Sequence, residues 1–355
     1  MKVLTIPEHC TRTHGAHCTR CQLACPAKAL SFDEAGAPVI DRDACTKCGV
    51  CIGVCDEFSS NSATALRLYD HLRKVAMRGE IVYLTCEENV FPGFEPAKNV
   101  TVLPCLACVP PELWTLLLSQ NVPVCVACDL KYCEDCSRAA KIGELLFTKA
   151  IEIAEAQTGE SVHFDREIPE YVPPVEAVVD DEFDRRAAFD SVKDDAFGII
   201  SGRRRLKQSD TLKEAYRKKE RERMREALNL SEGEYLSDAL EKGRATRVMP
   251  PRRRMLLEAY AAKPDIAENV EIAVSATDHA ACVECLDCVA KCASGARIAT
   301  KEGHLEYDAR YCVGCGACEA ACPRNAIELV EATFADLLPE GPGKPAIEPN
   351  LADYE

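Results

Sequence analysis

Several features that would assign a function are missing from this 355-residue sequence. No run of 18 apolar residues is present, so no segment is predicted to cross a bilayer as a helix. The first residues, MKVLTIPEHC, contain no apolar stretch long enough for a secretory signal. No phosphate-binding loop, dinucleotide-binding fingerprint or pairing of a nucleophile with a base stands out, and the histidines are scattered. We therefore expect a cytoplasmic protein without a membrane span, and no catalysis by the isolated chain.

Positive charge is also scarce, because the formal net charge is −15 at pH 7. An acidic surface argues against nucleic acid as a partner. The exception is a basic stretch, residues 201–254, with 17 Lys and Arg against 9 Asp and Glu. Its alternating charges are typical of a solvated helix face, and the alternative is a docking surface for an acidic partner. We predict docking there through the cationic residues Arg203, Arg204, Arg205, Lys218, Lys219, Arg221, Arg252, Arg253 and Arg254.

Cysteine is the residue that the sequence has in excess, with 23 in the chain. At about 6% of the residues, their density is below that of a small disulfide scaffold. Their number is odd, and almost all are separated by only two or three residues, close enough to hold one metal centre. This spacing favours reduced thiolates that bind metal in the cytoplasm over disulfide bonds.

Most cysteines fall into two paired runs, and within each pair the runs are offset by 30 residues. The N-terminal pair consists of Cys18, Cys21 and Cys25, followed by Cys45, Cys48, Cys51 and Cys55. The C-terminal pair consists of Cys282, Cys285, Cys288 and Cys292, followed by Cys312, Cys315, Cys318 and Cys322. An internal repeat indicates two copies of one small unit. The units have too few apolar residues to fold on a core alone, so we expect bound metal to stabilise them.

The runs resemble the C-x2-C-x2-C-x3-C-P signature of bacterial-type ferredoxin domains, which hold two [4Fe–4S] clusters each. Proline follows Cys25 and Cys322 but not the final cysteines of the other two runs. In that family each cluster is bound by three cysteines of one run and the last cysteine of the other. The resemblance therefore implies four [4Fe–4S] clusters. In the C-terminal pair, one cluster would be bound by Cys282, Cys285, Cys288 and Cys322, and the other by Cys312, Cys315, Cys318 and Cys292. In the N-terminal pair, one would be bound by Cys45, Cys48, Cys51 and Cys25, and the other by Cys18, Cys21, Cys55 and a fourth group. Four cysteines also bind zinc, but zinc ligands usually form two separated pairs.

The fourth ligand of the last set is not obvious, because Gly15 stands where the repeat would place a cysteine. Cys10 lies eight residues before Cys18, and a loop of this length closes at modest entropic cost. His14 and His17 are the alternatives, since histidine replaces cysteine in some iron–sulfur centres. We expect Cys10 to be the ligand.

Residues 59–170 show a different pattern, in which helices alternate with short apolar strands. Apolar residues at helical spacing predict a first helix that is capped by Ser60, Asn61 or Ser62 and stops at Gly79. Further helices are expected at 110–121 and 139–159, and buried strands at 80–86, 100–105 and 122–128. This alternation predicts a small parallel α/β layer. Its cysteines lie at the carboxyl ends of the strands, where open α/β sheets build their sites.

The seven cysteines of this middle domain can form a site in three ways. Cys86, Cys105 and Cys128 follow successive predicted strands, and CDLKYC at 128–133 is a C-x4-C motif. On these residues the stretch 80–158 resembles the delta subunit of methyl-viologen-reducing hydrogenase, in which a [2Fe–2S] centre passes electrons to a flavoprotein. The resemblance implies a further iron–sulfur cluster, either [2Fe–2S] or [4Fe–4S], on Cys86, Cys105, Cys128 and Cys133. A zinc ribbon would instead use two C-x2-C pairs, Cys105 with Cys108 and Cys125 with Cys128. A thioredoxin-like dithiol is the third alternative, and other ligands could come from Cys108, Cys125 and Cys136.

Together these patterns predict an α+β multidomain chain. Two ferredoxin-like dicluster domains, at 1–58 and 271–334, flank a small parallel α/β domain at 59–170 and a linker with a charged helical segment at 171–270. The tail, 335–355, is expected to be disordered. The expected function is that of a multi-cluster electron-transfer subunit within a larger oxidoreductase, partnered by a flavoprotein, hydrogenase, formate dehydrogenase or molybdenum enzyme subunit. The alternatives are a disulfide- or substrate-reducing enzyme that uses the middle cysteines, and a zinc-stabilised interaction module.

Overall fold

The two ends of the chain repeat one arrangement of a strand, a helix, a hairpin, a second helix and a final strand. The computed structural model describes residues 2–6, 10–60, 64–171, 247–300, 302–344 and 346–354. The N-terminal copy consists of β1 (Val3–Thr5), α1 (Arg20–Ala24), β2 (Leu30–Phe32), β3 (Pro38–Ile40), α2 (Val50–Val54) and β4 (Phe58–Ser60). The C-terminal copy consists of β9 (Glu271–Thr277), α11 (Asp287–Lys291), β10 (Arg297–Ala299), β11 (Leu305–Tyr307), α12 (Ala317–Ala321) and β12 (Ile327–Thr333). In both copies the first and last strands pair antiparallel, and the inner two strands form the hairpin.

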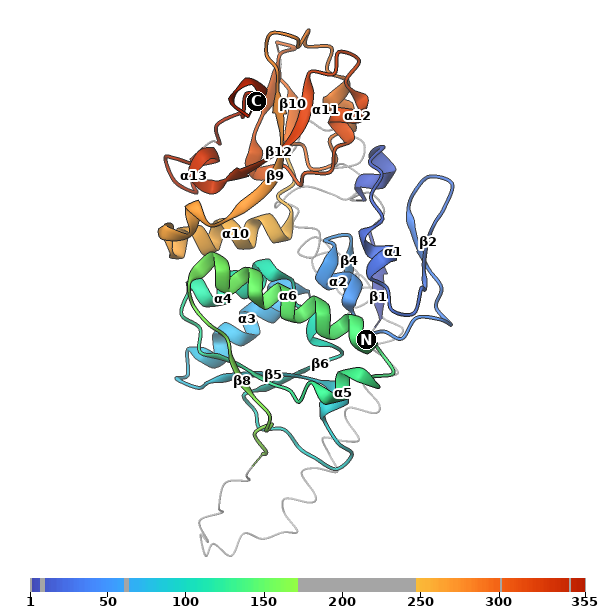
Figure 1. Ribbon diagram of the computed structural model, residues 1–355, viewed down its shortest axis with the longest axis vertical. Coiled ribbons are helices and arrows are strands. Elements are labelled where there is room, and N and C mark those ends of the chain that lie inside the picture. The colour runs from blue at the N-terminus through green and yellow to red at the C-terminus, as the bar shows by residue number, and fades with distance from the viewer. Residues whose placement is uncertain are drawn as a thin grey trace, which may run out of the picture. The chain divides into compact units, whose positions relative to one another are not determined.

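Between these copies lies the predicted parallel sheet, which the structure confirms. Its strands are β5 (Val82–Cys86), β6 (Val100–Leu103), β7 (Val124–Ala127) and β8 (His163–Asp165), in the order β6-β5-β7-β8. The helices α3 (Ala65–Ala76), α4 (Pro111–Ser119) and α6 (Ala140–Thr158) cover one face of the sheet (Figure 1). Helix α5 (Lys131–Glu134) follows β7. Strand β8 was not predicted, because all three of its residues are exposed and carry no apolar pattern.

The predicted cap of the first helix of this domain was wrong. Helix α3 begins at Ala65, and its cap is Thr64, whose hydroxyl accepts a hydrogen bond from the backbone N–H of Arg67 at 3.2 Å. A threonine at this position satisfies a backbone donor that has no partner within the helix. The later helix ends agree with the sequence, since Gly159 closes α6 in the left-handed conformation.

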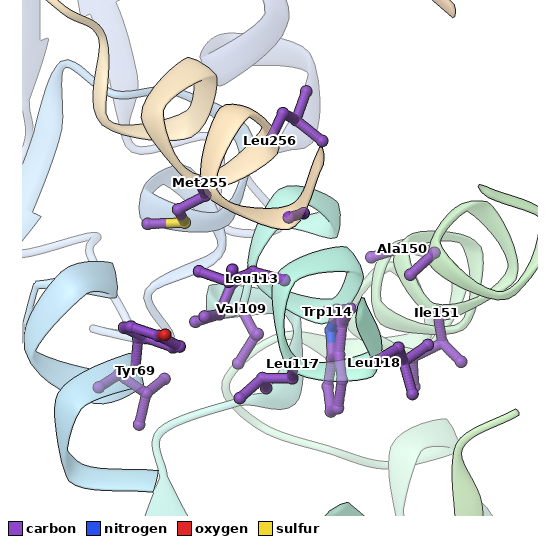
Figure 2. Packing of buried hydrophobic residues seen from close by; sticks show 14 of the residues in the cluster. Tyr69, Val109, Leu113, Trp114, Leu117, Leu118, Ala150, Ile151, Met255 and Leu256 are labelled. Carbon is purple, nitrogen blue, oxygen red and sulfur yellow. The ribbon is translucent and has the colours of Figure 1, made fainter. Parts of the chain in front are cut away.

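Helix α4 is the centre of the main hydrophobic core. Its residues Leu113, Trp114, Leu116 and Leu117 are fully buried. A helix that is apolar on all sides must be covered on all sides. Figure 2 shows how this is achieved, with side chains of α3 and α6 beside α4 and those of α10 (Pro251–Ala262) against its remaining face.

Helix α10 corrects the expectation that residues 171–270 are only a linker and a charged segment. Met255 and Ala259 of α10 are fully buried in the core that α4 centres. The same core continues into the C-terminal copy, where it includes Val274 and Phe334. All described residues belong to one compact unit. The middle sheet, α10 and the C-terminal copy therefore share one hydrophobic core.

Of the arginines that were expected to dock a partner, Arg253 is buried inside the chain and Arg252 is partly buried. Arg252 donates to the backbone carbonyl of Gly53 and pairs with Asp56 at 3.5 Å. Arg253 donates to the carbonyl of Cys312 at 2.6 Å. Both residues start α10 directly after a proline pair, and its packing on α4 turns them inward. The other predicted docking residues except Arg254, namely Arg203, Arg204, Arg205, Lys218, Lys219 and Arg221, lie outside the described residues.

The tail also differs from the expectation of disorder. Helix α13 (Phe334–Leu337) begins with a capping box between Thr333 and Asp336. Further along, the N–H of Ile347 donates to the carbonyl of Leu337, and the N–H of Thr277 donates to that of Pro349. These backbone bonds hold the tail against the C-terminal copy, which the polar composition of the tail did not indicate. Among the described helices, none has the length and apolar character that crossing a membrane requires.

Candidate metal centres

In the C-terminal copy the eight cysteines surround two separate small cavities. One is lined by Cys282, Cys285, Cys288 and Cys322, and the other by Cys292, Cys312, Cys315 and Cys318. The last cysteine of each run thus reaches the cavity formed by the other run, because α11 and α12 pack side by side and lead the chain across. This is the grouping that the ferredoxin resemblance implied. The predicted sets are therefore gathered in space.

The loops that carry these cysteines share an unusual backbone. On either side of the second cysteine of a run the residues adopt positive φ angles, as at Glu284 and Leu286 (51° and 65°) and at Gly314 and Gly316 (60° and 74°). In the N-terminal copy, Lys47 and Gly49 do the same around Cys48. Alternating left-handed residues curl a short loop around one point. At Gly314 a side chain would also collide with the backbone of Ala273 in β9, so this position requires glycine.

In the N-terminal copy, Cys25 joins the second run of cysteines. The thiols of Cys25, Cys45 and Cys48 are close enough to Cys51 to act on it electrostatically. Burial first, and then the charges of these neighbours, raise the pKa of Cys51 to about 12. A metal centre would remove this penalty, because a coordinating thiol is deprotonated outright.

The first run is gathered with Cys10. Burial raises the pKa of Cys21 to about 11, and the next causes are the charges of Cys18 and Cys10. Cys10 is buried at the start of a short 3-10 helix (Thr11–His14), whereas His17 is exposed. Cys55 and Cys18 both line the cavity beside this set. The structure therefore places Cys10, rather than His17, among the thiols of this set.

This set departs from the other three in both of its halves. Helix α1 begins at Arg20, so Cys21 is not flanked by the paired positive φ angles. In the other sets the third residue after the crossing cysteine has a positive φ, as at Lys28, Gly295 and Asn325. After Cys55 the third residue is Phe58, which begins β4. The displaced fourth cysteine is therefore one part of a loop that is built differently throughout.

The residues present fit four-thiolate iron–sulfur centres. Backbone N–H groups donate to three of the crossing sulfurs: Ala29 to Cys25 and Ala326 to Cys322, both at 3.3 Å, and Arg297 to Cys292 at 3.5 Å. Hydrogen bonds of this kind stabilise the negative charge of a cluster-bound thiolate. All 23 cysteines are free of disulfide bonds. Within the described ranges, no three Cys, His, Asp or Glu side chains converge closely enough to hold a single metal ion.

Another cavity, the middle cavity, lies above the carboxyl edge of the parallel sheet. Five cysteines line it, namely Cys86, Cys105, Cys128, Cys133 and Cys136. The four that were predicted to bind a cluster are thus brought together, and Cys136 joins them. Cys108 and Cys125 do not line this cavity. Cys125 lies within β7, and Cys108 ends the 3-10 helix η4 (Leu106–Cys108).

Asn89 is a residue of this site that the sequence did not reveal. Its side-chain amide donates to Cys86 at 3.0 Å and to Cys128 at 3.3 Å, and its oxygen accepts from the N–H of Asp129. The hydrogen bond from Cys128, together with that from Asn89, lowers the pKa of Cys86 to about 6 despite burial. Hydrogen bonds to Cys133 and Cys86 raise the pKa of Cys128. The site therefore stabilises thiolate in a buried position.

The middle cavity adjoins the N-terminal copy. Helix α2 packs against η4, and Gly53 of α2 touches the carbonyl of Ala107. Burial raises the pKa of Cys108 to about 12, and the charge of Cys48 is the next cause. The charge of Cys48 also contributes to the raised pKa of Cys105, which lines the middle cavity. A second contact joins the hydroxyl of Thr46 to the carbonyl of Arg138 at 2.7 Å.

Comparison with known proteins agrees with this geometry at the C-terminal copy. The family model of the 4Fe-4S dicluster domain matches residues 266–327. Over 56 residues the chain is 43% identical to a subunit of the ion-translocating oxidoreductase complex of Methanosarcina acetivorans. It is also similar to pyruvate synthase subunit PorD, at 38% identity over 52 residues in Methanothermobacter marburgensis and 40% over 53 residues in Methanocaldococcus jannaschii. No solved structure matches the chain.

These likenesses cover only part of each protein. The matched stretches are 15–16% of this chain, and they span 21%, 59% and 62% of the three relatives. The C-terminal copy is thus an iron–sulfur domain of the ferredoxin type, a class that transfers electrons. More particularly, it is a dicluster domain with at least two [4Fe–4S] clusters, similar to subunits of oxidoreductase complexes.

Proposed function

We propose that this protein is a multi-cluster electron-transfer subunit that relays electrons within a larger cytoplasmic oxidoreductase. The C-terminal copy binds two [4Fe–4S] clusters, the N-terminal copy binds two more with Cys10 as the displaced ligand, and the middle cavity binds a fifth iron–sulfur centre. The catalytic partner is a redox protein such as a flavoprotein, hydrogenase, formate dehydrogenase or molybdenum enzyme subunit. The chain itself supplies cluster positions and electrostatic surroundings.

One observation carries this proposal, namely that the cysteines form five adjacent groups. Four groups belong to the two ferredoxin-type copies, and the fifth lines the middle cavity. Cys48 of one N-terminal group is near enough to Cys105 and Cys108 to influence both thiols. Adjacent redox centres, rather than a substrate pocket surrounded by acid and base groups, are typical of an electron relay.

Anaerobic purification of the full chain tests the proposal. We expect iron and acid-labile sulfide for five centres, little zinc, and visible absorbance that bleaches with dithionite. The full chain is needed, because α10 covers the apolar face of α4 and a middle fragment would expose that face. A double variant, Cys86→Ser with Cys128→Ser, should lose the fifth centre and retain the other four. A zinc atom in the middle site would contradict the relay there and support the interaction module.

A disulfide-reducing enzyme is the second candidate, and the middle site favours it in one respect. Cys86 has its pKa lowered by the hydrogen bond from Cys128 and by Asn89, and a thiolate beside a second thiol is the arrangement of a redox dithiol. Turnover of a small disulfide by the isolated chain would favour this function. A zero rate with an iron-loaded middle site would exclude it.

A further inference from the structure

The two ferredoxin-type copies differ at one corresponding buried position. The first residue of the hairpin is Leu30 in the N-terminal copy and Arg297 in the C-terminal copy, each five residues after a crossing cysteine. Across the hairpin, Leu30 faces Ile40, and Arg297 faces Tyr307. Leu30 packs in an apolar cluster with Val3, Cys21 and Phe58. The C-terminal copy thus holds a charge where the N-terminal copy holds an alkyl group.

The structure is built to keep the guanidinium of Arg297 inside. Its side chain is only 1% exposed. It donates to the hydroxyls of Ser275 and Thr277 at 3.0 and 2.9 Å, and lies over the ring of Tyr307 with 4.7 Å to the ring centre. Arginine stays protonated even when buried. A buried charge is costly unless something compensates it.

The carboxylates around Arg297 compensate its charge only weakly. Among the described residues, Glu348 is the one acidic side chain within 4.0 Å, and it makes no hydrogen bond to the guanidinium. The Nη1 atom of Arg297 has no hydrogen-bond partner in the described part of the chain. A negatively charged cluster in the cavity that Arg297 lines would supply the compensating charge.

Arg297 lies between the two C-terminal cysteine sets. Arg297 lines the cavity of Cys292, Cys312, Cys315 and Cys318, and Cys318 packs against Cys288 in one small apolar cluster. Cys288 belongs to one set and Cys318 to the other. The backbone N–H of Arg297 also donates to the sulfur of Cys292. One guanidinium therefore acts on both sites.

The N-terminal copy shows no equivalent charge among its described residues. Arg252 lies near Cys55, but Asp56 and Glu112 balance it at 3.5 and 3.9 Å. Arg12 donates to the carbonyl of Cys18 at 3.3 Å, but it is half-exposed, so water screens its charge. The two copies therefore differ in that only the C-terminal copy, among the described residues, holds a buried positive charge without a close carboxylate partner.

We propose that Arg297 makes the C-terminal pair of clusters the electron-accepting end of this chain. A buried positive charge stabilises the additional negative charge of a reduced cluster, and so raises its reduction potential. Each internal transfer moves one electron, which oxidises an N-terminal site and reduces a C-terminal one. Arg297 keeps its proton throughout. This inference rests on the proposed function and adds a direction to it.

The test is a redox titration of the full chain followed by EPR. Signals are assigned with Cys45→Ser for the N-terminal copy and Cys285→Ser for the C-terminal copy. In the unmodified chain we expect the C-terminal signals to appear at higher potential. Arg297→Met should reduce the equilibrium constant for reduction of both C-terminal clusters at least tenfold, which is about 59 mV for one electron.

Two further variants separate charge from structure. Arg297→Lys keeps the charge and should shift the C-terminal potentials by less than half as much as Arg297→Met. Leu30→Met changes the corresponding N-terminal position without a charge, and should leave all potentials unchanged. If Arg297→Met does not load its clusters, the order of potentials in the unmodified chain and in Arg297→Lys decides the matter.

A higher potential for the N-terminal clusters in the unmodified chain would overturn the inference. So would equal potentials for Arg297→Met and the unmodified chain. Either result leaves the proposed function standing, because the clusters would still be present and redox-active. Purified chain without iron and sulfide would instead remove the proposed function itself.

Discussion

Gly53 of α2 lies directly against the backbone carbonyl of Ala107, and no side chain fits between them. This contact joins α2, which carries Cys51, to η4, which begins after Cys105 and ends at Cys108. A glycine is needed here for space rather than for an unusual φ angle. The close packing of the second N-terminal cysteine run on the middle site therefore requires that residue 53 has no Cβ.

Gly53→Ala should separate α2 from η4. The added methyl group would overlap the carbonyl of Ala107, so we expect a loss of about 1–3 kcal/mol in the free energy of unfolding. Anaerobic denaturant unfolding measures this loss. Gly343→Ala is the control, since a Cβ there meets no atom within 4 Å, and it should change stability by less than about 0.5 kcal/mol. Equal stability of the two variants would contradict the contact.

Cys10→Ser should remove a ligand of one N-terminal cluster. Cys10 is buried beside Cys18 and Cys21, so its loss should cost up to about four iron atoms per chain, or leave a three-iron centre. Iron analysis and EPR after mild oxidation measure both outcomes. The double variant His14→Ala, His17→Ala should keep its clusters. Loss of iron from the histidine variant alone would make a histidine the ligand.

Arg252→Met should destabilise the fold rather than weaken partner docking. The substitution leaves Asp56 and Glu112 as partly buried carboxylates without their cation, which costs about 3–5 kcal/mol. Thermal or denaturant unfolding tests this. Arg254→Ala, at a half-exposed position paired with Glu258, should cost no more than about 0.5 kcal/mol. A stable Arg252→Met chain that fails to bind its partner would restore the docking interpretation.

Asn89→Ala should affect the middle centre alone. Without the amide, Cys86 and Cys128 each lose a hydrogen bond, and fewer hydrogen bonds to sulfur lower the potential of a cluster. We expect a lower midpoint potential and faster bleaching in air for this centre, with the ferredoxin-type signals unchanged. Asn99→Ala is the control, because that amide donates only to the carbonyl of Ile81. A change in all signals would place Asn89 in a general structural role.

Iron removal should unfold the ferredoxin-type copies before the middle sheet. Beside its metal sites the N-terminal copy has an apolar cluster of only a few residues, one of them a cysteine. The C-terminal copy shares the large core, but around its cysteine loops it has only a similar small cluster. The middle sheet and α10 share a large core that consists mainly of aliphatic and aromatic side chains, which we expect to hold without metal. After chelation, limited proteolysis with mass spectrometry should find cuts near Cys18–Cys25 and Cys282–Cys292 and protection around α4. Uniform cleavage would show that the middle domain also depends on iron.

The sequence was informative wherever a signal is local. The pattern of apolar residues predicted α4, α6 and three strands of the sheet, because the residues that an element buries recur at a fixed spacing along the sequence. Cysteine spacing similarly indicated a dicluster domain, which the match at residues 266–327 supports. The full ligand sets remain predictions, although the structure gathers them.

What the sequence could not give depends on contacts between distant segments. Arg252 and Arg253 read as surface charge until α10 is seen to pack on α4. Asn89 and Cys128 are far apart in the sequence, and no motif connects them, so their hydrogen bond could not be predicted without the fold of the sheet. For Arg297 a signal did exist. Aligning the repeats places Arg297 opposite Leu30, so the sequence alone shows a charged residue where the other copy has an apolar one.

The small apolar clusters of the ferredoxin-type copies have a consequence for the cell. If iron binds at both ends as proposed, the lifetime of the chain depends on iron supply. When iron is scarce, newly made copies would expose their cysteine loops to proteases and be degraded before they reach their partner. The amount of this protein would then follow the metal without any change in transcription.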